Sequence, residues 1–509
     1  MEVKKQCVNL GKTVFDGQVK ASCEGNIIVP DVKPDIIKVL QVEADTFLCD
    51  KTVENGKVTL SGKVNVTVLY TPEDDSLSVC AIRGCFEFCE VIKRSEFTDD
   101  MQIVAFCDAD KVTYRLINSR KISVEALVAV NMQVVKNESI EYVSGIDGDD
   151  AQCRYENINI SSFGLYKECG FELEESFSLP AGKPEIREIL KGNVMILEKE
   201  YKTLNDKVVV KGKGIVDVLY LGCDGEIDHF GGEIPFTEVV DMSGIFEDTE
   251  CDISFEVCDV KLAFDGDKES GQCINVSFDV TLGIKTENEQ SVTALSDCYF
   301  TDAHEQLEYI DVCADETVAR PKFSAVLKEV LTKKEGMPDI SGVYSAVAKP
   351  CVESVKVQGS KILVGGKVVI YVLYTTDNIQ VPVCSINEEV PFNYAIECEK
   401  LSDECDILLK GECEHISSVI CSGDAVEVRC GIVICGRVVK KRCVRMISDA
   451  QKGECLCKEN GILVYFAKKG DCVWDVAKKY RVCGSCVYDS LQGSEEICEG
   501  MKLIIPVYK

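Results

Sequence analysis

Apolar and polar residues alternate along three 13-residue segments of this 509-residue chain. The segments read VTLSGKVNVTVLY (58–70), VVVKGKGIVDVLY (208–220) and ILVGGKVVIYVLY (362–374), and all share Gly-Lys and then Val-Leu-Tyr. In the first copy one face carries Val58, Leu60, Val64, Val66, Val68 and Tyr70. A period of two predicts a half-buried strand, and the glycine near its middle (Gly62) predicts a bulge or bend.

A second alternating segment begins 52 to 54 residues after each of these tyrosines. Its predicted inward residues are Ile122, Val124, Ala126, Val128 and Val130; then Ile274, Val276, Phe278, Val280 and Leu282; then Val426, Val428, Cys430, Ile432 and Ile434. Between the two segments, copies two and three share Pro-Phe at 235–236 and 391–392, where copy one has Cys85-Phe86. Each copy therefore holds at least two predicted strands in the same order.

A proline stands 36 residues before each final tyrosine, giving the pairs Pro34 and Tyr70, Pro184 and Tyr220, and Pro338 and Tyr374. An acidic residue and isoleucine follow each proline, and apolar residues then recur at i, i+3 and i+4. This spacing predicts a short helix with proline in its first turn, where the missing N–H costs nothing. The acid complements the helix N-terminus.

The tyrosines are 150 and 154 residues apart, which indicates a chain built from internal repeats. We predict three repeats at residues 1–150, 151–298 and 299–450. The predicted fold is mainly β, with three tandem β-sandwich-like units and peripheral short helices. The prolines and tyrosines are predicted to be structural residues, and the tyrosines to be largely buried.

The pattern changes after Cys457 to strand, helix, helix and strand. Leu463, Tyr465 and Ala467 alternate, whereas Val473, Val476, Ala477 and Tyr480 follow helical spacing. A second short helix is predicted over 486–491, and Leu503, Ile504 and Ile505 make the return strand. The sequence thus predicts a small α+β (βααβ) domain over residues 458–509.

The formal net charge of −30 disfavours binding to nucleic acid or anionic lipid. One local exception is the basic run of Arg437, Lys440, Lys441, Arg442 and Arg445, which we interpret as a solvated strand edge. The chain has no apolar stretch of about 18 residues and no apolar segment at its N-terminus, so we expect neither membrane insertion nor export.

Thirty cysteines in a chain without an export signal favour thiols in a reducing cytoplasm over a disulfide framework. Cys430 and Cys435, in an otherwise apolar strand, are expected to act as small hydrophobic residues. The alternative for Cys455, Cys457, Cys483 and Cys486 is a structural zinc site, but the Cys-x-Cys spacing is poor for it. We therefore predict no metal.

No catalytic motif stands out. The three histidines, His229, His304 and His415, occupy unrelated positions of the repeats. No Gly-x-Ser-x-Gly motif and no phosphate-binding loop occur, and the Gly-Lys of the repeats lies in mid-strand. We expect a non-enzymatic protein without a cofactor.

The C-terminal segment resembles the LysM family. The matching residues are Lys469-Gly470-Asp471, Trp474, Ala477-Lys478-Lys479-Tyr480, Ile497, Gly500, Lys502-Leu503 and Pro506. The resemblance implies a shallow groove for N-acetylglucosamine-containing glycans between two loops, here Gly470, Asp471, Cys472 and Val473, and Glu496, Ile497, Cys498 and Glu499. It also implies a buried Trp474.

This chain departs from the LysM pattern at two groove positions, where Cys472 replaces the usual threonine and Glu499 the usual proline. A thiol is a poor hydrogen-bond partner for a sugar. We therefore predict that the groove binds protein, with Val473 and Ile497 as anchors. Nearby bases (Lys468, Lys469, Lys478, Lys479 and Arg481) would steer an acidic partner.

The repeats resemble the SPOCS domain of sporulation proteins from spore-forming Firmicutes, through the segment PDVKPDI (30–36) and the Val-Leu-Tyr strand. Three such repeats before a LysM module resemble spore-coat morphogenetic proteins. The resemblance implies a scaffold in the mother-cell cytoplasm, at the forespore surface, that binds the spore-coat ATPase stage IV sporulation protein A. The alternative function is binding of peptidoglycan through LysM.

Overall fold

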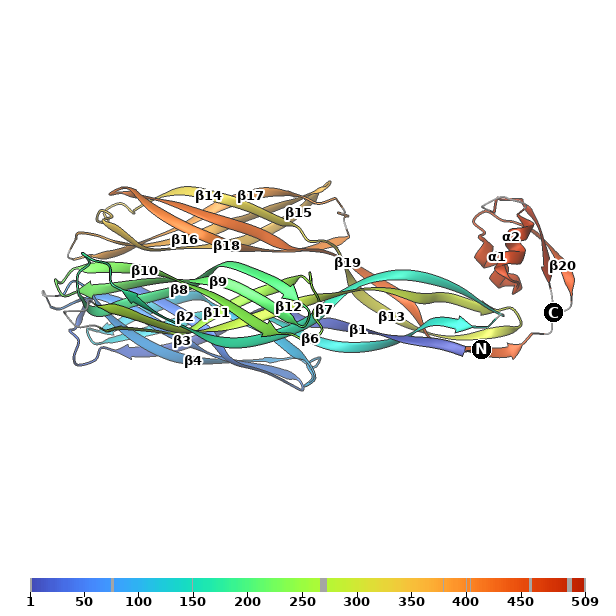
Figure 1. Cartoon of the computed structure of the whole chain (residues 1–509), viewed down its shortest axis with the longest axis horizontal. Helices are drawn as coiled ribbons and strands as arrows, with labels where there is room; N and C mark the ends of the chain where they lie inside the picture. Colours follow the sequence, from blue (N-terminus) through green and yellow to red (C-terminus); the bar gives the residue numbers. More distant parts are fainter. Residues whose placement is uncertain are drawn as a thin grey trace.

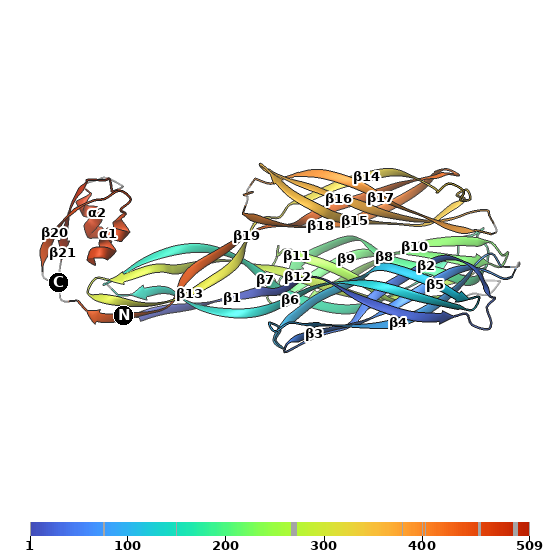
Figure 2. The same ribbon diagram turned by 180° about the vertical axis from the view of Figure 1, so that it is seen from behind.

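The structure is a computed structural model, and it describes residues 2–74, 77–148, 150–265, 272–378, 380–399, 401–402, 404–456, 460–491 and 497–507. The described chain is mainly antiparallel β-sheet, as the alternating pattern predicts. Three β domains lie side by side, and a long narrow bundle of strands runs from them to a small module that contains both helices (Figure 1, Figure 2).

Each domain is one repeat with two layers of strands. Repeat 1 has the sheet β1 (Glu2–Ile28), β6 (Lys121–Asp147), β5 (Gln102–Asn118) and the sheet β2 (Ile36–Glu54), β3 (Lys57–Pro72), β4 (Cys80–Lys93). Repeat 2 has β7 (Ala151–Ser178), β12 (Cys273–Phe300), β11 (Cys251–Asp265) and β8 (Ile186–Leu204), β9 (Lys207–Gly222), β10 (Ile227–Asp241).

Repeat 3 follows the same plan, except that its first strand is split by the Arg320-Pro321 step. Its layers are β13 (Ala303–Ala319) and β14 (Lys322–Thr332) with β19 (Ala425–Cys455) and β18 (Cys405–Ser422), and β15 (Gly342–Gln358), β16 (Lys361–Thr375), β17 (Val383–Glu397). Proline has no N–H to donate to a ladder, which accounts for the break. A pairing of β7 with β13 joins one layer of repeat 2 and one layer of repeat 3 into a seven-stranded sheet.

The two layers of each repeat share an apolar core. The 13-residue segments are the central strands β3, β9 and β16, and their tyrosines, Tyr70, Tyr220 and Tyr374, are 0% exposed. The second predicted strands are β6, β12 and β19, and their predicted inward residues are all buried. Tyr70 also donates a hydrogen bond of 3.0 Å to the carbonyl of Pro34, which ties the strand to the loop before β2.

The short helix predicted after each proline is wrong, because that stretch is loop and strand in all three repeats. In β2 the pairing with β3 skips Ile37 and Leu40, so two bulged residues stand within five positions. Each bulge shifts the two-residue alternation by one. As a result Ile36 and Val39 share the inner face, while Leu40 points away from it. Two closely spaced bulges thus imitate helical spacing.

The mid-strand glycine has the same surroundings in the three central strands, and the irregularity lies in the neighbouring strand and not at the glycine. The neighbouring strand is irregular opposite Gly62, Gly212 and Gly366. On the other side, a buried phenylalanine pairs directly with each glycine: Phe88, Phe236 and Phe392. The repeat-1 partner is therefore Phe88, and the alignment that placed Phe86 there is wrong.

The ends of six strands form the narrow bundle, which we call the stalk. Each repeat contributes one antiparallel pair: β1 with β6, β7 with β12, and β13 with β19. Apolar residues from all three pairs meet inside it, namely Val8, Leu10, Tyr142, Ile158, Ile160, Val292, Ala294, Val312 and Met446. The stalk is therefore a joint product of the three repeats.

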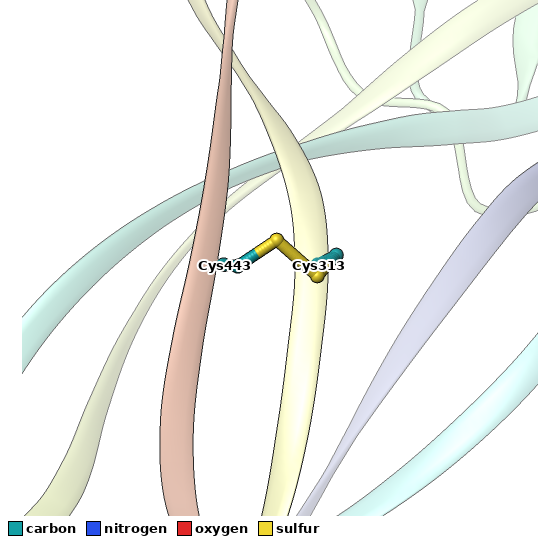
Figure 3. Close-up of a disulfide and its surroundings, with 2 residues drawn as sticks. All are labelled: Cys313 and Cys443. Atoms are coloured by element: carbon teal, nitrogen blue, oxygen red, sulfur yellow. A yellow bond between two sulfur atoms is a disulfide. The ribbon is translucent and has the colours of Figure 1, made fainter.

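A disulfide joins Cys313 of β13 to Cys443 of β19 on the stalk (Figure 3). The two residues are direct cross-strand partners with Cα atoms 4.0 Å apart, and both are exposed. The prediction of free thiols is therefore wrong for this pair. The other cysteines of the described chain are free.

A second shared core lies between the repeats, and we call it the inter-repeat core. The leucine of each Val-Leu-Tyr, Leu69, Leu219 and Leu373, is at most 1% exposed and points away from its own repeat's core. The bulged residues Leu40 and Leu190 and the equivalent Tyr344 pack with them. Adjacent residues of one motif thus serve two cores, one within a repeat and one between repeats.

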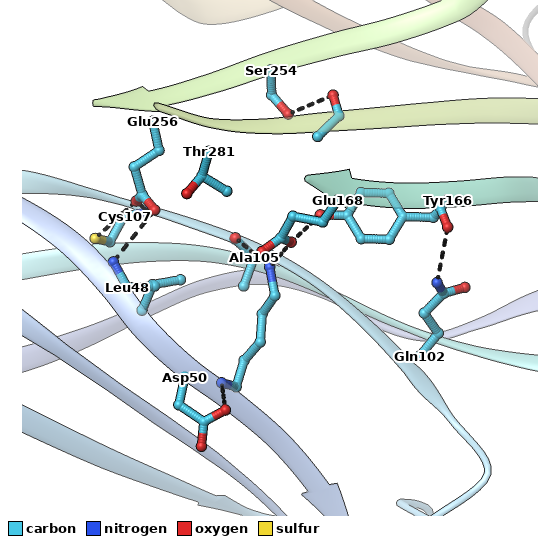
Figure 4. Close-up of polar contacts among 12 residues, drawn as sticks. Leu48, Asp50, Gln102, Ala105, Cys107, Tyr166, Glu168, Ser254, Glu256 and Thr281 are labelled. Atoms are coloured by element: carbon cyan, nitrogen blue, oxygen red, sulfur yellow. Dashed lines mark hydrogen bonds and ion pairs between the residues drawn. The ribbon is translucent and has the colours of Figure 1, made fainter. Parts of the chain in front are cut away.

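Polar contacts also join repeats 1 and 2 (Figure 4). Glu256 of β11 is 8% exposed and accepts hydrogen bonds from the backbone N–H groups of Leu48, at 3.4 Å, and Cys107, at 3.2 Å. Lys51 forms an ion pair with Glu168. Burial raises the pKa of Glu256 above its ordinary value.

Candidate binding site

The C-terminal module consists, in order, of β20 (Gly461–Phe466), α1 (Val473–Tyr480), α2 (Gly484–Ser490) and β21 (Lys502–Val507). β20 and β21 form an antiparallel pair, and the helices cover one face of it. The core of the module includes Tyr465, Val476, Ala477, Val487, Leu503 and Ile505. Assignment of this module to the LysM family stays a prediction.

The two loops of the predicted groove lie next to each other. The N–H of Ala467 donates to the carbonyl of Met501 at 2.9 Å, and the N–H of Gly500 donates to the carbonyl of Ala467 at 2.8 Å. Gly470 and Gly500 have φ of +91° and +82°, a backbone conformation that favours glycine. Glu496 lies outside the described residues.

Two groove residues are engaged within the module. Asp471 accepts from the Tyr465 hydroxyl at 2.7 Å and from the Lys468 N–H at 2.8 Å, and these bonds, the Lys468 bond first, lower the pKa of Asp471. Cys472 is the N-cap of α1, and its Sγ accepts from the Asp475 N–H at 3.4 Å. The sulfur thus does at the helix N-terminus what a hydroxyl usually does.

The predicted anchors Val473 and Ile497 are partly buried against the module's own core. Cys498 and Glu499 are exposed beside them. Trp474, predicted to be buried, is half-buried, and its Nε1–H donates to Asp297 of the stalk at 2.9 Å. The anchors therefore offer only part of their surface to a ligand.

Sequence analysis missed an apolar strip on the outer face of the module. Ile462, Val464 and Phe466 of β20 are 73%, 48% and 61% exposed, and Ile504 of β21, paired with Val464, is 49% exposed. We call these four residues the outer strip. The signal was present, because residues 462–467 are apolar at every position and not only at alternate ones.

The other residues considered from the sequence, the cysteine pairs and the basic run, do not form a binding site in the described part of the chain. Within the described ranges no group of three or more His, Cys, Asp or Glu side chains is arranged to hold a metal ion, and Cys457 lies outside them. The basic run lies on β19. Arg437 and Lys440 lie where β18 pairs with this strand, whereas Lys441, Arg442 and Arg445 lie where β19 pairs with β13 alone, so the strand-edge interpretation is confirmed for the last three residues of the run. Its side chains are partnered: Arg437 with Glu287, Lys440 with Glu404, Lys441 with Asp406, and Arg442 with Glu316.

Neither helix of the described chain is long and apolar enough to cross a membrane, since α1 has eight residues and α2 has seven. The fold is that of a modular β protein, in which three interlocked domains carry a small module at one end.

The family model described as "SipL, SPOCS domain" matches residues 35–117, 185–265 and 339–420, one segment in each repeat. The chain therefore carries three SPOCS domains, as its repeats predict. The matched segments do not include the C-terminal module. No curated protein and no solved structure matches the chain. The presence of these domains indicates a role in sporulation.

Proposed function

We propose that the protein is a non-enzymatic scaffold for assembly of the spore envelope, coat and cortex. It acts in the mother-cell cytoplasm, at the forespore surface. Its C-terminal module binds the spore-coat ATPase, stage IV sporulation protein A, and the three SPOCS domains form a rigid body behind that module. The ATPase is proposed as the partner because of the resemblance to spore-coat morphogenetic proteins. The surface of the module indicates which kind of contact it makes.

The observation that carries a protein partner is the outer strip. Four large apolar side chains, about half exposed or more, lie on one face of a two-stranded sheet. Exposed apolar clusters of this kind are typical of protein interfaces. Lys502 is paired with Phe466 on the same face, and Lys468 and Lys469 follow at its end, so the strip favours an acidic apolar partner surface.

The alternative is a peptidoglycan-binding protein that uses the module as a glycan-binding LysM. Asp471 and Cys472 argue against it, since both are engaged by backbone and side-chain groups of the module. A sugar would have to compete with those bonds for its own hydrogen-bond partners. The exposed Glu499 adds a carboxylate beside them.

The test is co-purification and a binding titration with the purified ATPase. Deletion of residues 458–509 should abolish binding, and Val464→Asp should weaken it at least about tenfold, the effect of losing 1.4 kcal/mol at an interface anchor. Val326→Asp is the matched control, because Val326 is 67% exposed on β14, on a different domain. Full binding by the deletion variant, together with saturable binding of the intact chain to chitin oligomers, would make the glycan function correct.

A further inference from the structure

The C-terminal module is attached to the stalk by more than the chain that connects them. Tyr299, near the end of β12, is 0% exposed and belongs to the hydrophobic core of the module. Its hydroxyl donates to the carbonyl of Val482 at 2.7 Å, and its ring meets that of Trp474 edge to face, with centroids 5.2 Å apart. Repeat 2 therefore supplies a residue to the core of the module. The two residues joined by that hydrogen bond are 183 positions apart in the sequence.

Asp297 provides a second, charged contact on the same strand. One carboxylate oxygen accepts from Trp474 Nε1 at 2.9 Å, and the other accepts from Lys478 Nζ at 2.6 Å. Both donors lie on α1, one turn apart. This places a single acid of the stalk between the two residues of α1 that face it, which fixes the rotation of the helix.

Arg481 makes a third contact at the C-terminal end of α1. Its guanidinium donates to the carbonyl of Ala303 at 2.8 Å and to Glu305 at 2.6 Å, in the turn and first residues of β13. Its backbone has φ of +53°, the left-handed conformation that glycine usually occupies at a helix end. An arginine there strains the backbone locally, and the stalk contacts offset that strain.

Gln152 of β7 makes a fourth contact with the module. Its Oε1 accepts a hydrogen bond of 3.2 Å from the N–H of Gly484, at the start of α2. In both views the helices lie on the side of the module toward the stalk, and β20 and β21 lie on the far side (Figure 1, Figure 2). The contacts come from β7, β12 and β13, so they depend on the assembled stalk.

From these contacts we infer that the tip of the stalk is a built-in dock that holds the C-terminal module in one orientation. The chain's own residues cover the α1 face, and the outer strip on β20 and β21 faces away from the body. The module therefore has a fixed orientation at the tip of the stalk. A partner reaches it through the sheet face, and the α1 face is available only after undocking. The link to a partner rests on the proposed function; the dock itself does not.

Trp474 makes the dock measurable, because it is the only tryptophan in the chain and lies at the contact. In the full chain, its fluorescence should be blue-shifted and poorly quenched by acrylamide. Asp297→Lys places two positive groups together, so the emission should shift to longer wavelength and quenching should increase. Combining it with Lys478→Asp should restore the wild-type signal. Glu172→Lys, an equal charge change at an exposed site on β7, is the control.

Arg481→Gly separates docking from folding of the module. Glycine suits the left-handed backbone at this position, so the backbone at the end of α1 is not strained by the change, but the Ala303 and Glu305 contacts are gone. It should shift the Trp474 signal toward solvent exposure with the module's helical circular dichroism unchanged. Unchanged fluorescence in both Arg481→Gly and Asp297→Lys would overturn the dock. The measurement needs no partner, so it stands whether or not the ATPase binds.

Discussion

At the residue scale, the Val-Leu-Tyr motif assigns neighbouring side chains to different cores. Tyr220 is enclosed by its own repeat, whereas Leu219 packs among all three. Alternation predicts the tyrosine, because it falls on the apolar face of the strand. The leucine had its own signal, since it is an apolar residue on an otherwise more polar face in each of the three copies.

The carboxyl of Glu256 should make stability depend on pH. Burial raises its pKa in the folded protein, so above its ordinary pKa of about 4.3 the folded state binds more protons than the unfolded state. Its contribution is therefore most favourable at low pH and is lost as pH rises through the folded pKa. Relative to Glu256→Gln, wild type should lose stability between pH 4.5 and pH 7.5 in urea-unfolding experiments.

The matched variant Glu172→Gln, exposed on β7, gives the baseline for this comparison. If the stabilities of wild type and Glu256→Gln change with pH in parallel, the Glu256 carboxyl has the same pKa in the folded and unfolded states. Burial between the repeats would then not raise its pKa.

At the scale of elements, each central strand has a glycine that lies under a phenylalanine ring and opposite an irregular neighbour. In repeat 3 these residues are Gly366, Phe392 and the stretch around Glu353. The ring covers the backbone that glycine leaves bare, which is how aromatic residues compensate for glycine in strands.

Gly366→Ala should therefore destabilise the protein. The added Cβ would lie 2.8 Å from the ring of Phe392 and would clash with the carbonyl oxygen of Cys351. Overpacking of this kind costs about 1–3 kcal/mol, to be measured as a lower urea midpoint. Gly461→Ala is the control, because no atom lies within 4 Å of its added Cβ. Equal midpoints for the two variants would show that the central strand tolerates a side chain at this position.

The sequence predicts strands well here and helices in the repeats badly, for one physical reason. Period two survives along β3, β9 and β16, but paired bulges at Ile37 and Leu40 break it where the helix was expected. Local spacing does not reveal the bulges, which depend on pairing with a strand further along the chain. The groove stays a prediction, and the roles of Asp471 and Cys472 depend on a helix cap and a turn that the sequence pattern does not show.

At the scale of the whole molecule, no repeat stands alone. Each gives one strand pair to the stalk and the leucine of its Val-Leu-Tyr motif to the inter-repeat core. These contacts join residues more than 100 positions apart, so a single-sequence pattern could not predict them. The dock at the tip extends the same principle, because Asp297 and Tyr299 of repeat 2 hold helix α1 of the C-terminal module.

This interlocking predicts that the three repeats unfold together, and that Leu219 controls the coupling. Leu219→Asp places a charge in the inter-repeat core without touching the core of repeat 2. Urea unfolding should change from one steep transition to a broader one with a smaller slope. Tyr220→Ala, one residue further, should instead destabilise repeat 2 itself by about 3–5 kcal/mol, as loss of a buried aromatic side chain does. Leu408→Asp, at a leucine 47% exposed on β18, is the control. If Leu219→Asp keeps the wild-type slope and midpoint, the repeats are independent domains and the inter-repeat core does not couple them.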